Sequence, residues 1–570
     1  DLHPQESAAF ARRTRIAVIS ICDLPSTSQP MKKRGSASIY REHVRYHAHQ
    51  SFHWTFMPLL RLSCCLLLVL FVRLGHTQTP VDWPTKTWQV STPEAQGMDS
   101  AALSNLYEYL ATAGFNTDSV LVIRHGRIVS ETYVAPFSAE LRHDLRSVTK
   151  SVVATLVGVA MQEGKIASLD QKVLSFFPDH SANGPLQETL TVGHLLDMAS
   201  GIQWQEHPYN EQSDALKLWK SKDWLKFILD RQVSVTPGEK FQYIAAAPHL
   251  LSAILTGSTG ANAAEYARQG LFKSLGIEDF AWSADPKGHT VGESSLRLKP
   301  RDMAKLGLLY SRRGRWEDRQ LLPPDWTATV FAGGLPNGYN PMSVPSTYSR
   351  LWWTDASVPY AAALGRHGQN IIVLPEQDVV LVVTSKTADT SRRSLAVDMV
   401  KRYLLPAIKG DAALPEDSAG QAKLAQAVRA LGAVGKHESQ QPNPQAEALA
   451  KRTFVLEPND WRLREFALVL SGPDPSFRLE QAARTFPFLN MSLGGPMGLQ
   501  GVYVASRNKF EGPMAFRGRW INGDTFRGEA QRLEGSIIME WTAEFTDGGL
   551  ALSYVDGDGR TFKVRGVPKE

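Results

Sequence analysis

Ser147 and Lys150 are the residues whose types and spacing most directly suggest covalent catalysis. They bound the segment Ser147-Val-Thr-Lys150, which opens an apolar run predicted to be helical to about Glu163 and to end at Gly164. Serine needs a base to act as a nucleophile, and residues three apart share one face of a helix, so the Lys150 amine can reach the Ser147 hydroxyl. The positive end of the helix dipole favours negative charge at the serine. A lysine base must be neutral, a state that burial and cationic neighbours favour.

The same four-residue pattern occurs a second time, in Ser506-Arg-Asn-Lys509. That copy follows a run of alternating residues typical of a strand, in which side chains three apart point to opposite faces. We therefore interpret it as a chance match.

Two later segments could complete a site around Ser147. Pro237-Gly-Glu-Lys-Phe-Gln-Tyr243 precedes a helical run, which would place the Tyr243 phenol at the mouth of a helix. Leu364-Gly-Arg366-His367-Gly368-Gln369 leads into a buried type of strand. Glycine there permits close approach of the backbone, and backbone N–H groups could face a substrate carbonyl.

Other side chains of catalytic type have less specific surroundings. His194 lies among apolar residues at a helix start and is interpreted as structural. His367 either lines the pocket or packs, and is not expected to be the base. Trp204 and Tyr209 either form a wall of the substrate pocket or pack in the core. Asp556-Gly-Asp-Gly559 is interpreted as a turn rather than a calcium loop. No phosphate loop or metal set is found in the sequence, so no cofactor and no metal are expected.

The elements that must position these residues follow an α+β pattern. Two β-rich runs at 119–134 flank His125-Gly126-Arg127, which predicts a hairpin, and residues 165–290 are mostly helical and rich in loops. Further helices are predicted at 98–114, 300–312 and 391–408, and strands at 370–374 and 378–384. This order predicts an antiparallel sheet flanked by helices, with a helical subdomain beside it.

The C-terminal part of the chain has a different character. Residues 411–445 are rich in Ala, Gln, Pro and charge and are predicted to be a linker with one helix. From 446 to 570, short alternating runs are separated by turn signals such as Asn522-Gly523 and Asp547-Gly-Gly549. This pattern predicts an all-β domain, either a sandwich or a small barrel. The catalytic domain is therefore assigned to residues 80–410.

Composition and charge exclude several classes of function for the chain after residue 79. The 570 residues contain three cysteines, Cys22, Cys64 and Cys65, so thiol catalysis and a disulfide framework are excluded from the bulk of the chain. Residues 1–79 carry ten Lys/Arg and four Asp/Glu, a net of +6, whereas the remainder carries 52 and 53, a net of −1. The basic character belongs to the leader and is no argument for nucleic-acid binding.

Residues 57–79 are interpreted as a signal peptide. Arg61 precedes an apolar run of 11 residues from Leu62 to Val72, which is too short to span a bilayer as a helix. An uncleaved N-terminal anchor is the alternative. Residues 1–56 are assigned to a disordered leader. The expectation is an exported protein, periplasmic or extracellular, with membrane contact only through the leader.

Taken together, the motifs resemble those of the serine β-lactamase-related hydrolases, over roughly residues 85–408. This group contains class C β-lactamases, D-alanyl-D-alanine carboxypeptidases, family VIII esterases and 6-aminohexanoate-dimer hydrolases. The resemblance rests on five segments: Ser147–Lys150, Leu190–Gly201, Pro237–Tyr243, Leu298–Tyr310 and Gly365–Gln369. It implies the β-lactamase/transpeptidase fold.

The resemblance also implies roles for individual residues. Ser147 would be the acylated nucleophile and Lys150 the base or its proton partner. Tyr243 would relay a proton to the leaving group and to the deacylating water. The third motif would be Arg366-His367-Gly368, and the N–H groups of Ser147 and Gln369 would form the oxyanion hole.

Two departures from the family pattern bear on the substrate. Ala245 stands where the second motif usually has Asn or Ser, and Arg366 stands where Lys, His or Trp is usual. Lys386-Thr-Ala388 resembles a third motif but lacks its glycine and comes one strand later. These departures put β-lactam specificity in doubt and favour esters.

The leading hypothesis is therefore an exported serine hydrolase acting on small esters or amides through an acyl-enzyme. A D-amino-acid peptidase or an amidase for ω-amino-acid oligomers is the alternative within the class, and a cell-wall peptide is a further candidate partner. A catalytically weak binding or sensor protein on the same fold is the alternative outside it. Covalent labelling of Ser147 would distinguish the enzyme from the binding protein.

Overall fold

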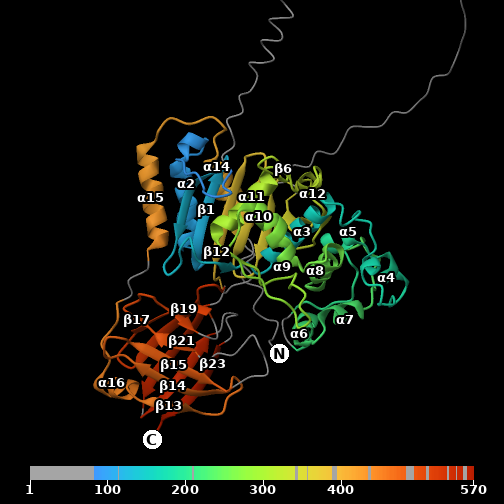
Figure 1. Cartoon of the computed structure of the whole chain (residues 1–570). Helices are drawn as coiled ribbons and strands as arrows, with labels where there is room; N and C mark the ends of the chain where they lie inside the picture. The colour runs from blue at the N-terminus through green and yellow to red at the C-terminus, as the bar shows by residue number, and fades with distance from the viewer. Residues whose placement is uncertain are drawn as a thin grey trace, which may run out of the picture. The chain divides into compact units, whose positions relative to one another are not determined.

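The computed structural model describes residues 83–570 apart from 113–114, 208–210, 340–343, 356, 388–394, 434–437, 483–492, 509–511, 536–537, 547 and 556–560. The leader, the three cysteines, Tyr209 and Asp556–Gly559 lie outside the described residues, so the signal peptide and export stay predictions. Figure 1 shows the chain coloured from its N-terminus to its C-terminus.

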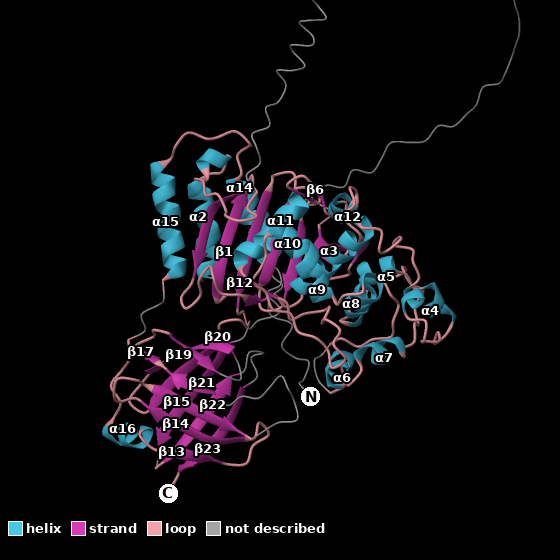
Figure 2. Cartoon of the chain, viewed as in Figure 1, coloured by secondary structure: helices cyan, strands magenta, loops and turns pink. Residues whose placement is uncertain are grey.

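The catalytic domain is built on one antiparallel sheet of eight strands (Figure 2). In spatial order the strands are β2 (Arg127–Tyr133), β1 (Thr117–Arg124), β12 (Val379–Ser385), β11 (Gln369–Leu374), β10 (Ala361–Gly365), β9 (Trp352–Thr354), β8 (Thr347–Ser349) and β7 (Leu335–Pro336). Two short pairs lie outside this sheet: β3 (His143–Asp144) with β4 (Arg297–Leu298), and β5 (Arg315–Trp316) with β6 (Arg319–Gln320).

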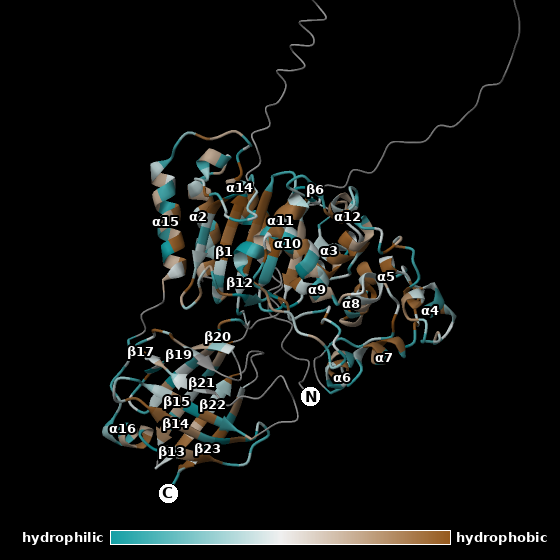
Figure 3. Cartoon of the chain, in the orientation of Figure 1, coloured by the Kyte–Doolittle hydropathy of each residue, from teal (hydrophilic) through white to brown (hydrophobic). Residues whose placement is uncertain are grey.

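The middle strands of this sheet are buried along their whole length. Every residue of β1, β11 and β12 is buried, which requires cover on both faces of the sheet. Their runs of Val, Ile and Leu supply the apolar surface, and these strands are hydrophobic in Figure 3. The predicted hairpin is confirmed: β1 and β2 pair around His125 and Gly126, both of which have positive φ.

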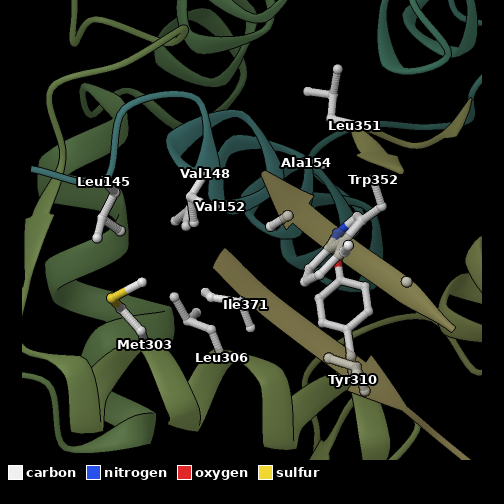
Figure 4. Close-up of a cluster of buried hydrophobic side chains, with 14 of the residues drawn as sticks. Leu145, Val148, Val152, Ala154, Met303, Leu306, Tyr310, Leu351, Trp352 and Ile371 are labelled. Atoms are coloured by element: carbon white, nitrogen blue, oxygen red, sulfur yellow. The ribbon is translucent and has the colours of Figure 1, made fainter. Parts of the chain in front are cut away.

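Helices before and after the strands cover the sheet. They are η1 (Glu94–Gln96), α2 (Ser100–Thr112), α3 (Val148–Gln162), α11 (Pro300–Ser311), α12 (Trp326–Phe331), α13 (Leu395–Asp398), η5 (Met399–Leu404) and α14 (Leu405–Ala407). Figure 4 shows Ile371 of β11 packed among side chains of α3 and α11, including Val152 and Leu306. The helix that carries Lys150 is therefore anchored in the main core.

Residues 165–290 form the predicted helical region. Its elements are η2 (Val173–Phe176), α4 (Pro185–Thr189), α5 (Val192–Leu196), α6 (Asp214–Lys220), α7 (Trp224–Leu229), α8 (Ala246–Thr259), α9 (Ala263–Ala267), the π-helical η3 (Arg268–Phe272) and α10 (Lys273–Leu275). Ser213, Asp223 and Asn262 cap α6, α7 and α9 through their side chains. Helix α8 packs against α3.

The strands between residues 335 and 365 were not predicted from the sequence. Three of these four strands, β7, β8 and β9, have only two or three residues, so no alternation can be recognised in them. They are recognisable only through their pairing, since β8 pairs with both β7 and β9, and β9 pairs with β10.

Residues 418–432, within the segment predicted to be a linker, form helix α15 (Ser418–Gly432). Asp417 caps its N-terminus through a bond from the Gly420 N–H. Its buried side chains Leu424, Ala427 and Leu431 belong to the same hydrophobic core as the catalytic sheet, and the helix packs on α2 and β2.

The C-terminal part of the chain is all-β, as predicted, apart from α16 (Pro444–Ala450) at its start. Its sheet runs β16 (Leu493–Pro496), β15 (Ser476–Gln481), β14 (Leu463–Val469), β13 (Thr453–Leu456), β23 (Thr561–Pro568), β22 (Gly549–Val555), β21 (Ile538–Thr546), β20 (Thr525–Arg532), β19 (Gly512–Trp520) and β17 (Gly498–Leu499), with β18 (Val504–Asn508) also on β19. The sheet is nearly barrel-like and has its own core, which includes Phe516, Trp541 and Tyr554. Ser506 lies in β18, so the strand interpretation of the second Ser-x-x-Lys pattern is confirmed.

Across the described ranges, no helix combines the length and apolar character needed to cross a bilayer.

The packing of α15 predicts that it contributes to the stability of the catalytic domain. We expect Leu424→Ala to lower the free energy of unfolding by about 2–4 kcal/mol, because it removes a buried side chain from the core. The matched control is Gln426→Ala on the exposed face of the same helix, which should change it by less than about 0.5 kcal/mol. Urea unfolding followed by tryptophan fluorescence measures both. Equal stability of the two variants would contradict the assignment of α15 to this core.

Candidate active site

Ser147 is the residue that begins helix α3. The preceding residue, Arg146, is held in the left-handed region at φ 49°, and its N–H donates to Asp144 Oδ1 at 3.0 Å. Leu145 is fixed by a bond from its N–H to the Leu296 carbonyl at 2.9 Å. This turn places Ser147 at the N-cap position without a capping bond from its side chain. Its hydroxyl is therefore not used to stabilise the helix.

Lys150 points from the first turn of α3 back to Ser147. Its Nζ lies 2.9 Å from Ser147 Oγ and 2.7 Å from the backbone carbonyl oxygen of Glu293. The residue is only 4% exposed. The amine is thus held between the hydroxyl and a fixed acceptor, in the direction predicted from the spacing of the two residues.

Tyr243 lies on the other side of Lys150. Lys150 Nζ is 5.1 Å from the centre of the Tyr243 ring. The ring stacks on Trp353 of β9, with centroids 5.6 Å apart and planes 26° apart, and it meets Tyr348 of β8 edge-on. The short strands that the sequence did not reveal therefore support this phenol.

Ala245, two residues after Tyr243, contributes its backbone rather than a side chain. It is buried at the N-cap of α8, and its N–H donates to Glu206 Oε2 at 2.9 Å. The same carboxylate oxygen accepts a bond from Trp204 Nε1 at 2.7 Å. Trp204 is thereby held in the core, 6% exposed, with its ring edge-on to Phe227.

The buried carboxylate of Glu206 interacts electrostatically with Lys150 and with the buried carboxylate of Glu293. Burial raises the pKa of Glu206, while the Ala245 N–H, the charge of Lys150 and the Trp204 N–H lower it; repulsion from Glu293 raises it further. Glu293 Oε1 accepts a bond from Trp219 Nε1 at 3.0 Å. The charged side chain shown to interact with Lys150 is therefore a carboxylate, that of Glu206.

The Arg366–Gln369 segment forms the turn between β10 and β11. His367 is buried with φ 67°, and its Nδ1 lies 3.0 Å from the Thr387 carbonyl oxygen. Gln369 Nε2 donates to the Ser385 carbonyl at 2.6 Å. Gly368 faces Ser385, since an added Cβ would lie 2.0 Å from the Ser385 hydroxyl oxygen. His367 thus packs toward the end of β12.

Gly365 is where this hairpin meets the nucleophile segment. An added Cβ would lie 2.4 Å from the Leu145 carbonyl oxygen and 3.2 Å from Cβ of Arg146. Gly365 pairs with Gln369 across the hairpin. Gly365 is therefore a point of close backbone approach between the β10–β11 hairpin and the residues before Ser147.

His194 and Lys386 are of residue types used in catalysis, but their contacts give them structural roles. His194 forms a capping box with Thr191: each backbone N–H donates to the other's side chain, at 3.2 and 3.3 Å, which confirms the structural interpretation. Lys386 is fully buried, paired with Asp118 at 2.6 Å and placed over the Phe137 ring. Its side chain is committed to that ion pair.

Of the site residues predicted, the structure brings Ser147, Lys150, Tyr243 and Ala245 together and connects Trp204 to them through Glu206. The sequence interpretation missed Glu206, Glu293 and Trp219. No local pattern marks these residues, because their contacts join segments 39 to 143 residues apart, apart from the local Trp204–Glu206 bond. In the part of the chain that is described, no group of three or more His, Cys, Asp or Glu could hold a metal ion.

The chain is similar in sequence to known proteins. A family model described as Beta-lactamase matches residues 103–402. The chain is 27% identical over 295 residues to a 6-aminohexanoate-dimer hydrolase of Paenarthrobacter ureafaciens, covering 49% of this chain and 74% of that protein.

Solved structures with a similar fold include an octameric penicillin-binding protein homologue from Pyrococcus abyssi, with a TM-score of 0.44, 14% identity and coverage of 81% of this chain and 99% of that one. A penicillin-binding protein homologue from Caulobacter crescentus has a TM-score of 0.43 and 16% identity, covering 54% and 97%.

The contact at Gly365 predicts that even one methyl group is too large there. Gly365→Ala would force the hairpin away from the Leu145 carbonyl, and we expect a loss of about 1–3 kcal/mol in the free energy of unfolding. Gly257→Ala, on an exposed position of α8 where an added Cβ would lie in ordinary contact, 4.0 Å from the Phe176 carbonyl oxygen, is the control and should be neutral or slightly stabilising. Thermal unfolding measures both, and an unchanged midpoint for Gly365→Ala would contradict the close approach.

Proposed function

Because the chain belongs to the Beta-lactamase family, whose members are serine hydrolases, we propose that it hydrolyses small ester or amide substrates through an acyl-enzyme on Ser147. The observation that carries this proposal is the position of Lys150 Nζ, 2.9 Å from Ser147 Oγ at the N-terminus of α3. A hydroxyl and an amine in hydrogen-bond contact form a nucleophile and base pair. The bond to the Glu293 carbonyl supports the amine in that place.

In the proposed acylation, neutral Lys150 takes the proton of the Ser147 hydroxyl while Oγ attacks the substrate carbonyl carbon. The tetrahedral intermediate collapses as the bond to the leaving group breaks, and the leaving group receives a proton through Tyr243. In deacylation, water attacks the acyl carbon while Tyr243 and Lys150 take up its proton. They return the proton to Ser147 Oγ as the acid leaves, which restores the Ser147 hydroxyl.

The negative charge of the tetrahedral intermediate needs donors that are already in place. We assign this role to the backbone N–H groups of Ser147 and Gln369. The location of Ser147 at a helix N-terminus and the contact of Gly365 with Leu145 support it, because they bring the β10–β11 hairpin beside the nucleophile. Arg366 and His367 are proposed to border this region.

An ester is the substrate that the second motif favours. Ala245 offers no side-chain amide or hydroxyl to a substrate amide, and its N–H is already bonded to Glu206. The alternative is an amide of an ω-amino-acid oligomer, supported by the relative named 6-aminohexanoate-dimer hydrolase. In both cases Trp204 is proposed to support the wall of the pocket through its contact with Glu206.

Removal of the nucleophile tests the proposal directly. We expect Ser147→Ala to lower kcat/KM for p-nitrophenyl butyrate by at least about 1,000-fold, because the catalytic groups act as a unit. Lys150→Met should lower it by about 100- to 10,000-fold. Ser506→Ala, in the second copy of the pattern, is the control and should retain full activity. Full activity of Ser147→Ala would refute the acyl-enzyme proposal.

The choice between ester and amide is tested by the adducts that Ser147 forms. Intact-protein mass spectrometry after mixing with an ester, with penicillin and with a 6-aminohexanoate dimer should show the acyl adduct most readily with the ester. A faster turnover of the ω-amino-acid amide than of the ester would instead select the amidase alternative. Ser147→Ala provides the blank for each adduct.

A further inference from the structure

His249 is a fully buried histidine for which neither the sequence motifs nor the proposed mechanism supplies a role. It lies in the first turn of α8, six residues after Tyr243, and its side chain has no exposed surface. A polar ring is costly to bury unless new hydrogen bonds replace those that it made with water. The bonds that His249 makes therefore indicate what it does.

Both ring nitrogens of His249 are bonded to the segment between α10 and β4. Nδ1 accepts a bond from the Gly292 N–H at 3.4 Å, which places a ring proton on Nε2. Nε2 then donates to Asp285 Oδ2 at 3.2 Å. The other oxygen of that carboxylate accepts the N–H groups of Lys287 and His289, both at 2.9 Å. His249 thus attaches this segment to α8 at two separate points.

The same segment lies directly against α8 at two further points. Ser252 Oγ, one turn after His249, donates to the Thr290 carbonyl at 2.7 Å. No side chain fits at Gly292, since an added Cβ would lie 2.1 Å from the Pro248 carbonyl oxygen. These contacts on Thr290 and Gly292 restrict where the backbone of the next residue can lie.

That next residue, Glu293, contacts the proposed base. Its backbone carbonyl accepts the bond from Lys150 Nζ at 2.7 Å, and the same Nζ lies 2.9 Å from Ser147 Oγ. The position of the carbonyl therefore determines where the amine is held. Three residues further on, the Leu296 carbonyl accepts the Leu145 N–H at 2.9 Å. One stretch of backbone thus contacts α8, the base and the turn before the nucleophile.

We infer that His249 and Ser252 are positioning residues for the proposed reaction: they hold residues 290–293 on α8 and so keep the Glu293 carbonyl in place for Lys150. A fixed acceptor is needed there because a long lysine side chain loses much conformational entropy when it is held in one rotamer. The inference rests on the proposed function, because it assigns the two residues an effect that acts through the proposed base.

His249→Leu and His249→Asn form a matched pair that isolates the bond to Gly292. The two new side chains have nearly the same shape, but only Asn carries an amide oxygen that can accept the Gly292 N–H in place of Nδ1. We expect His249→Leu to lower kcat/KM for p-nitrophenyl butyrate about 10- to 100-fold, because a small displacement of a catalytic group is costly. His249→Asn keeps this bond and should lose no more than about fivefold.

Ser252→Ala is a milder variant of the same attachment, and it serves the same test if His249→Leu does not fold. It removes only the hydroxyl that donates to the Thr290 carbonyl. We expect it to lower kcat/KM by about two- to tenfold, the effect of one lost hydrogen bond on the population of correctly placed amine.

A Lys150→Met background separates positioning of the base from a merely structural role. With the amine absent, the Glu293 carbonyl has no base to hold, so His249→Leu and Ser252→Ala should each change kcat/KM by less than about twofold. Leu424→Ala is the control for lost stability, because it lies in α15, which packs on α2 and β2. It should keep kcat/KM within about twofold of the wild type.

The outcomes distinguish this inference from the proposed function. Wild-type activity of His249→Leu or Ser252→Ala, equal losses in His249→Leu and His249→Asn, or equal losses with and without Lys150 overturn the positioning role while the proposed function stands. Full activity of Ser147→Ala or Lys150→Met overturns the proposed function itself. The rate at which a fluorophosphonate labels the full chain should follow the same order, and circular dichroism shows whether the compared proteins are folded to the same extent.

Discussion

The bond between Lys150 and Ser147 is the interaction on which the rest of the site depends. A helix brings the two side chains to the same face, but a flexible lysine has many other rotamers available in water. Burial and the Glu293 carbonyl remove that freedom, so that Nζ remains 2.9 Å from Oγ. The helical region and the edge strands of the sheet supply the surroundings that keep the amine in this position.

The electrostatic balance around this bond differs from the simplest expectation for a lysine base. Cationic neighbours would favour a neutral amine, whereas the structure shows an electrostatic interaction of Lys150 with the carboxylate of Glu206. The environment of the base therefore depends on the helical region, which supplies Glu206, as well as on the Ser-x-x-Lys motif itself.

Close packing supports the site at several points where side chains leave no free space. Gly365 allows the β10–β11 hairpin to meet the Leu145 carbonyl, and Trp353 stacks on the ring of Tyr243. Helix α15 adds its buried side chains to the core of the catalytic domain. The C-terminal β-domain has a core of its own.

The sequence by itself determined the nucleophile pair, the hairpin at 119–134, the helices at 98–114, 147–163 and 300–312, and the all-β character of the C-terminal part. These features are local: a 3.6-residue or two-residue periodicity and an i, i+3 spacing can be recognised without knowledge of the fold. Strands β7, β8 and β9, Glu206 and Glu293 were decided only by the tertiary structure. Two-residue and three-residue strands exist through pairing alone. A carboxylate becomes part of a site only when folding removes its water and supplies distant partners, as the Ala245 N–H and Lys150 do for Glu206.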